Sequence, residues 1–178
     1  MSEDKKFYGK YRATVVSNFD PEFRGRLTLI IPDVASFIPN TYAEPCVPLA
    51  GPTGPPMGVY MVPPPGAGVW VEFENGNSNY PIWVGCRWGD PAGIPPLAKA
   101  GIPASPSIIL QTLGQSAIII SDAPGPGGGI MLKSAGLTGN SSVIINDTGI
   151  YLTAGAASII LNAASGAVNI NNGALSVI

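Results

Sequence analysis

Histidine is absent from this chain, which removes the usual general base of serine and cysteine hydrolases and the commonest ligand of transition metals. Cysteine is nearly as scarce, because Cys46 and Cys86 stand alone, without a CxxC spacing. They form either one disulfide or, as we favour, two buried free thiols. The sequence therefore predicts no catalytic residue, no cofactor and no metal ligand, and we expect a protein that is not an enzyme.

Charge is scarce in the second half of the chain. Residues 101–178 carry only Asp122, Lys133 and Asp147, whereas residues 1–100 hold eight basic and nine acidic side chains. The formal net charge is -2, and no Lys or Arg cluster is present to neutralise phosphates, so we expect no nucleic-acid partner. No run approaches the roughly 18 apolar residues of a spanning helix. The charged N-terminus also lacks the apolar segment of a secretory signal, so we expect assembly in the cytoplasm of the producing cell.

Short β-branched runs separated by Gly, Ser, Ala or Asn recur about eight times in the second half. Strands this short are stable only when they stack and share an apolar interior, which predicts an oligomer. We expect three chains to wind together into an interwound trimeric β-helix rod, with a single-chain solenoid as the alternative. The predicted strands are 107–110, 117–120, 130–132, 143–145, 150–152, 159–161, 168–170 and 175–177.

The outer residues of each run share one face of a strand and should point into this rod, while flanking Ser, Asn and Thr face water. A polar residue among them should prevent trimer assembly. The predicted trimer core is Ile118, Ile120, Ile130, Leu132, Val143, Ile145, Ile150, Leu152, Ile159, Leu161, Val168 and Ile170.

The first half has the pattern of a small all-β domain. Alternation predicts strands at 7–16, 27–31, 42–49, 69–73 and 80–85, with a hairpin turn at 74–77. Five short strands with long loops and no helical period indicate a small closed OB-fold barrel. We divide the chain into an N-terminal arm (1–6), an OB-fold collar (7–90), a proline-rich linker (91–106) and the spike (107–178).

Three motifs of the collar carry a family likeness. Their defining residues are Asp20, Pro21, Gly25, Arg26, Pro32, Gly66, Val69, Val71, Phe73, Gly76, Pro81 and Gly85. In order and spacing they resemble the OB-fold domain of contractile-tail spikes. That family contains phage baseplate assembly protein V and the valine-glycine-repeat (VgrG) spikes of type VI secretion, and it commonly places a trimeric β-helix after the barrel.

The resemblance implies a structural role. The chain would be a homotrimeric central spike at the tip of a contractile tail or injection particle. A baseplate or tube hub protein would bind at the OB end, a separate tip protein of the PAAR type would cap the other end, and the rod would puncture the target cell envelope. The hub domain and the His-rich iron-binding tip that some relatives carry are not matched here.

Other readings of single motifs remain open. Glu72 and Glu74 are either a carboxylate pair on one strand face or a solvated hairpin face, and the second is favoured. Residues 125–129 are a turn rather than a phosphate loop, because the Lys-Ser/Thr of such a loop is missing. Asp122, Asn146 and Asp147 are either turn-forming residues or hard-cation ligands, and we favour the turns.

An alternative function belongs to the binding class. Trp70, Trp83, Trp88 and Tyr80 would form a stacking platform for sugars in a fibre-like carbohydrate-binding adhesin. Packing in the core or between subunits explains the same residues more simply. An enzyme carried on the spike is a third reading, but no segment has room for a further catalytic domain.

Overall fold

A computed structural model describes residues 5–34, 41–52, 54–99, 103–124, 127–136, 139–172 and 174–177. The predicted all-β class is confirmed, because strands dominate and the helical segments are short 3-10 turns. No helix in the described ranges is long and apolar enough to cross a membrane. The chain forms two compact units, residues 1–91 and 92–178, each of which is described by itself.

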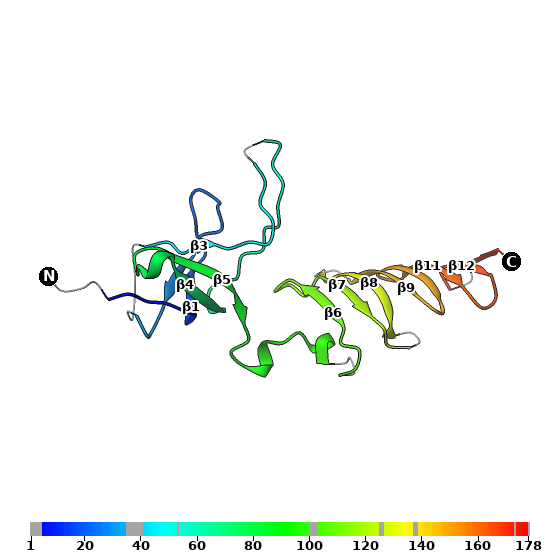
Figure 1. The fold of residues 1–178 in the computed structure, drawn as a ribbon. Helices are drawn as coiled ribbons and strands as arrows, with labels where there is room; N and C mark the ends of the chain where they lie inside the picture. The colour runs from blue at the N-terminus through cyan, green and yellow to red at the C-terminus, as the bar shows by residue number, and fades with distance from the viewer. Residues whose placement is uncertain are drawn as a thin grey trace. The chain divides into compact units, whose positions relative to one another are not determined.

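The first unit is a five-stranded sheet with the strand order β2-β1-β4-β5-β3 (Figure 1). β1 pairs antiparallel with β2 and β4, β4 pairs antiparallel with β5, and β3 pairs parallel with β5. Leu27 and Ala43 exchange two backbone hydrogen bonds of 2.8 and 3.1 Å, which join the two ends of this order into a barrel. The strands are β1 (Tyr11–Ser17), β2 (Thr28–Ile30), β3 (Glu44–Pro45), β4 (Gly68–Phe73) and β5 (Pro81–Arg87).

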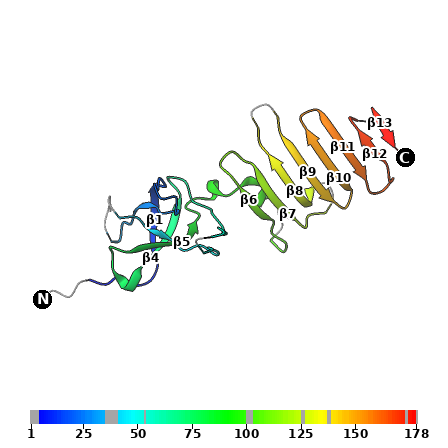
Figure 2. The same cartoon turned by 90° about the horizontal axis from the view of Figure 1, so that it is seen from above.

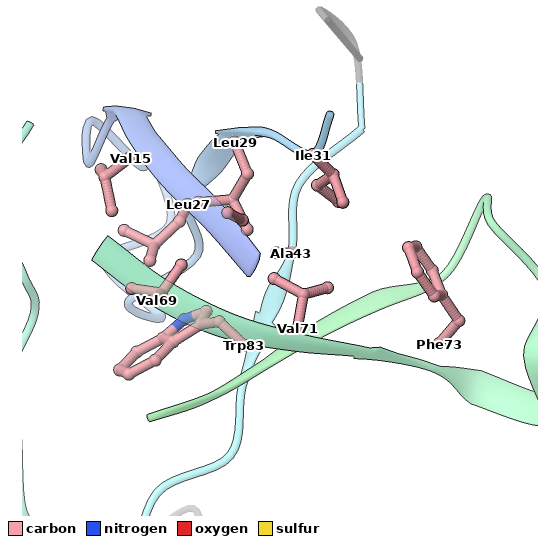
Figure 3. Packing of buried hydrophobic residues seen from close by; sticks show 10 residues of the cluster. Val15, Leu27, Leu29, Ile31, Ala43, Val69, Val71, Phe73 and Trp83 are labelled. Carbon is pink, nitrogen blue, oxygen red and sulfur yellow. The ribbon is translucent and has the colours of Figure 1, made fainter. Parts of the chain in front are cut away.

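Side chains that alternate between buried and exposed along the strands fill the interior of this barrel. Along β4 every second residue is buried, and β1 and β5 follow the same period over part of their length. Figure 3 shows these side chains converging between the strands. The buried cluster consists of Ala13, Val15, Leu27, Leu29, Ile31, Ala43, Val69, Val71, Phe73 and Trp83.

Three predicted strands are shorter than expected, and the second, predicted at 27–31, covers only Thr28–Ile30. The first begins at Tyr11 instead of residue 7, because Phe7 crosses to the β4–β5 turn and donates its backbone N–H to the Gly76 carbonyl at 2.9 Å. The third covers Glu44–Pro45 only, since proline has no N–H to continue a ladder. The hairpin turn is confirmed as the 3-10 turn η1 (Glu74–Gly76), where Asn75 and Gly76 adopt φ values of 51° and 72°.

The predicted linker contains two 3-10 turns, η2 (Pro91–Gly93) and η3 (Pro96–Lys99). Residues 100–102 of the linker and residues 1–4 of the N-terminal arm lie outside the described residues. So do Gly125 and Pro126 of the glycine-rich turn, and Ile178.

The second unit is one eight-stranded antiparallel sheet in which each strand pairs with its neighbours in the sequence (Figure 2). All eight predicted strands are present, and the four in the middle, predicted at 130–132, 143–145, 150–152 and 159–161, are each three residues longer than predicted. Each chain forms the whole ladder of eight strands by itself. The winding of three chains around each other remains a prediction. The strands are β6 (Ile108–Gln111), β7 (Ala117–Ser121), β8 (Gly129–Ser134), β9 (Ser141–Asn146), β10 (Gly149–Ala154), β11 (Ala157–Asn162), β12 (Val168–Ile170) and β13 (Leu175–Val177).

Candidate functional site

The repeat sheet carries large aliphatic side chains on one face, in two columns that run from strand to strand. Register keeps the columns straight: Ile118 pairs with Leu132, Leu132 with Val143 and Val143 with Leu152. Paired residues of adjacent strands lie on the same face of a sheet. The structure therefore places all twelve residues of the predicted trimer core on one face, which we call the apolar face.

This face is exposed in the single chain. The exposed fractions of Ile118, Ile130 and Leu161 are 48, 47 and 39 %. Sequence reasoning missed three further members, Ile108, Leu110 and Leu175, although the same alternation would have found them. Branched aliphatic side chains contribute roughly 1.5–3 kcal/mol each when they are fully buried. Eleven of these fifteen residues are exposed and four are half-buried, so the face calls for a protein partner.

The opposite face is mixed in character, with an apolar column between polar residues. Two of its members, Ala117 and Ile119, are only 7 and 6 % exposed, which makes them more buried than any residue of the apolar face. The polar flank includes Ser142 and Thr153, whose hydroxyl groups are 2.8 Å apart. The polar flanks suit contact with water. The central column is Ile109, Ile119, Met131, Ile144, Tyr151 and Ile160.

Turns between the strands are fixed by side-chain hydrogen bonds. At the β9–β10 turn the Asn146 Oδ1 accepts the Thr148 and Gly149 backbone N–H groups at 3.0 and 3.2 Å, and the Thr148 hydroxyl at 2.7 Å. Asn146 is thus a turn-forming residue, as favoured from the sequence. Asp122 accepts a hydrogen bond from the Ser105 hydroxyl at 2.7 Å. Among the described residues, no group of three or more Cys, Asp or Glu side chains is placed to hold a metal ion.

In the first unit, one buried carboxylate organises the β1–β2 loop. Asp20 Oδ1 accepts the Glu22 N–H at 3.0 Å and the Arg26 Nη2 at 2.6 Å, while Oδ2 accepts the Arg24 and Arg26 N–H groups at 2.8 and 3.2 Å. The Arg26 guanidinium holds the pKa of Asp20 well below its usual range, with the backbone N–H groups adding to the effect against the opposing influence of burial. Asp20 raises the pKa of Arg26 in turn. The ion pair and these hydrogen bonds hold the β1–β2 loop in one conformation.

Several other family-motif residues shape the backbone or lie in the core. Gly25, Gly66 and Gly76 adopt φ values of 80°, 87° and 72°, where a Cβ is unfavourable. The Gly25 carbonyl accepts the buried Trp83 Nε1–H at 3.0 Å. Val69, Val71 and Phe73 lie in the core. These positions shape the barrel.

The structure places the residues of two alternative site interpretations, the carboxylate pair and the aromatic platform, in different surroundings. Glu72 lies on β4 and forms an ion pair with Lys10 at 2.6 Å, whereas Glu74 lies in η1, so the expectation that both share one strand is wrong. β4 ends at Phe73, and Glu74 is the first residue of the turn η1. Trp83 is in the core, and Trp88 is exposed, so the aromatic residues do not form one platform.

Cys46 and Cys86 are both exposed free thiols, which corrects the expectation that they are buried. Cys86 follows Gly85 near the end of β5, where the residues are no longer deeply buried. Partial burial still raises the pKa of its thiol.

A shallow depression of about 240 Å³ lies by η1 and is lined by Lys6, Glu74, Asn75, Asn77 and Tyr80.

Two family models match the chain over most of its length. Residues 11–88 match the type VI secretion system/phage-baseplate injector OB domain, and residues 107–176 match the phage baseplate V C-terminal trimerisation domain. No curated protein matches the chain. A barrel of the first kind followed by a trimerisation sheet of the second defines a structural component of a contractile tail or injection system.

The chain belongs to the family of phage baseplate V and VgrG-type spike proteins. Its trimerisation domain indicates a homotrimer that associates with a baseplate. The apolar face lies in that domain, and its exposed aliphatic side chains are of the kind that a protein partner covers.

Proposed function

We propose that this protein is the central spike of a contractile particle, and that it transmits the force of sheath contraction to a target envelope and punctures it. The observation that carries this proposal is the apolar face, which runs through all eight strands of the trimerisation sheet. Three such faces packed together would make a dry interior along the whole stack. Close-packed interiors have low compressibility, which suits a part that must transmit force.

The work of the spike is mechanical, with no reaction at any of its residues. In this proposal the OB unit binds the tube hub protein, and a separate tip protein of the PAAR type covers the far end of the sheet. β13 supports the second contact, because among the described residues its outer edge has no neighbouring strand. Such an edge presents backbone donors and acceptors that a capping protein can pair. Assembly takes place in the producing cell.

Deletion and complementation in the producing strain test this role. We expect particles without the chain to contract without permeabilising target cells, and the wild-type gene in trans to restore permeabilisation, measured by uptake of a membrane-impermeant dye. Particles that lack the chain and still permeabilise target cells at the wild-type rate would overturn the proposal.

A further inference from the structure

Two segments of the OB unit lie side by side although they are far apart in the sequence. Asn18 Nδ2 donates a hydrogen bond to the Pro63 carbonyl at 3.3 Å. At the other end of the same loop, a Cβ built on Gly25 would lie 3.6 Å from the Tyr60 ring and 3.3 Å from Val62 Cγ2. The β1–β2 loop and residues 60–63 therefore form one continuous surface.

Large apolar side chains stand out from these segments. The exposed fractions of Phe19 and Phe23 are 72 and 81 %, and Tyr60 and Met61 are also mostly exposed. We call these four residues the aromatic loop surface. The same unit already has a core of ten other apolar residues, so it does not need these four side chains for its own packing. Exposed aromatic and methionine side chains on adjoining segments are typical of a site that binds another protein.

The loop that carries the two phenylalanines is held rigidly. Phe23 has a φ of 54°, a left-handed conformation that costs a residue with a Cβ roughly 1–2 kcal/mol. Asp20 sustains it, because its carbonyl accepts the Phe23 N–H at 3.0 Å and its carboxylate binds the N–H groups of Glu22, Arg24 and Arg26. An aromatic side chain on a rigid loop loses little conformational entropy on binding, which favours affinity.

The charges of the loop are already paired. Arg24 lies 2.9 Å from Glu44 and 3.6 Å from Glu22, and Arg26 lies 2.6 Å from Asp20. Both arginines of the loop are thus engaged with carboxylates and are poorly placed to bind phosphates or anionic lipid head groups. This favours a protein with an apolar recess as the partner.

We propose that the aromatic loop surface inserts Phe19 and Phe23 into an apolar recess of the hub protein and so anchors the spike. This inference rests on the proposed function and names the residues that make its hub contact. Phe23 is the central anchor because it is the most exposed of the four and its backbone N–H is bonded to the Asp20 carbonyl. Interface residues of this kind carry a large share of the binding energy.

The test uses particles assembled in a producing strain that lacks its own copy of the gene and expresses variants in trans. Phe23→Ala and Phe19→Ala remove one anchor each. Tyr80→Ala is the matched control, since Tyr80 is a similarly exposed aromatic residue of the same unit on the β4–β5 turn. Spike content of purified particles is measured by quantitative mass spectrometry, and the native mass and circular dichroism of each purified variant are measured in parallel.

We expect Phe23→Ala and Phe19→Ala to form folded trimers whose content in particles falls at least tenfold, while Tyr80→Ala matches the wild type. Folded trimers of both variants that enter particles at the wild-type level would overturn the proposal and leave the proposed function standing. Loss of the trimer in both variants would assign the surface to a second copy of this chain and overturn it too. If particles made with the wild-type gene contained no spike at all, both the proposed function and the hub contact would be refuted.

Discussion

Asp20 and Arg26 form a buried ion pair in which Oδ1 and Nη2 are 2.6 Å apart, and the same carboxylate binds three backbone N–H groups of the loop between β1 and β2. Arg26 also lies over the Tyr42 ring, with its guanidinium carbon 4.6 Å from the ring centroid. One side chain thus fixes a turn, satisfies a charge and positions the exposed Phe23. The loop has a defined shape because of this pair.

The pair predicts an acid-sensitive barrel. The folded-state pKa of Asp20 is lowered, chiefly by Arg26, so its contribution to stability is present above the ordinary aspartate value of about 3.9 and is lost as pH falls below it. Asp20→Asn should lower the Tm at pH 7 and flatten the decline of Tm between about pH 5 and pH 2. Tryptophan fluorescence reports on this unit, since Trp70, Trp83 and Trp88 all lie within it.

Asp33→Asn is the matched control for this experiment, because Asp33 is an exposed carboxylate of the same unit. Its Tm should follow the wild type at every pH. An Asp20→Asn protein with the Tm and pH dependence of the wild type would show that the ion pair does not stabilise the fold.

Trp83→Phe tests the hydrogen bond that ties the core to the loop. The substitution removes the Nε1–H donor from the Gly25 carbonyl, now 3.0 Å away, and leaves a buried acceptor without a partner. Such a loss costs about 1–3 kcal/mol, and the smaller ring adds a cavity. Urea unfolding followed by circular dichroism should show this decrease, whereas Trp88→Phe at an exposed position should change stability by less than about 0.5 kcal/mol. Equal stabilities of the two variants would contradict the role of this bond.

The strands could be predicted from the sequence because period-two alternation is a local signal. All eight repeat strands and the turns between them follow from β-branched runs and small residues. The family motif also included Val69, Val71 and Phe73, which lie in the barrel core. What escaped prediction depends on a contact distant in the sequence: Phe7 crosses to Gly76 instead of extending β1.

The interaction surfaces were predicted in part. Twelve residues of the apolar face were found by alternation, but Ile108, Leu110 and Leu175 were not selected, although their strands were recognised. The aromatic loop surface was missed because Phe19 and Phe23 lie in a turn without periodicity. Their exposure depends on the buried Asp20, which the sequence pattern alone does not reveal.

Ile145→Asp tests the apolar face as the trimer contact. A carboxylate there would have to lose its hydration in an apolar interface, which costs several kcal/mol per chain, and three chains would place three such charges near one another. We expect the native mass, measured by light scattering on a sizing column, to fall from that of three 18.3 kDa chains to that of one. A thermostable trimer of this variant would refute the assignment of the face.

Asn146→Asp supplies the control at the neighbouring position. It adds the same charge on the opposite face of β9, and a carboxylate can still accept the hydrogen bonds of Thr148 and Gly149. The trimer should therefore persist. Dissociation of both variants alike would mean that charge anywhere on this strand, and not the apolar face, decides assembly.

The close pairing of β8 with β9 depends on a glycine. Gly129 has a φ of 91°, and a Cβ at this position would lie 2.0 Å from the Ile145 carbonyl oxygen, a backbone atom that cannot move without opening the ladder. Gly129→Ala should therefore separate two strands of the apolar face and lower both the Tm and the trimer fraction. Gly155→Ala is the control, because Gly155 also has a positive φ of 59° but no atom within 4 Å of its built Cβ.

The control substitution should cost only the left-handed strain of about 1–2 kcal/mol per chain, and Gly129→Ala should cost at least twice as much. Thermal unfolding followed by far-UV circular dichroism separates the two contributions. If the two variants lose the same stability, backbone strain alone governs both positions and the contact with Ile145 has no energetic weight. A larger loss at Gly129, together with dissociation, would show that the ladder must close within each chain before three apolar faces can meet.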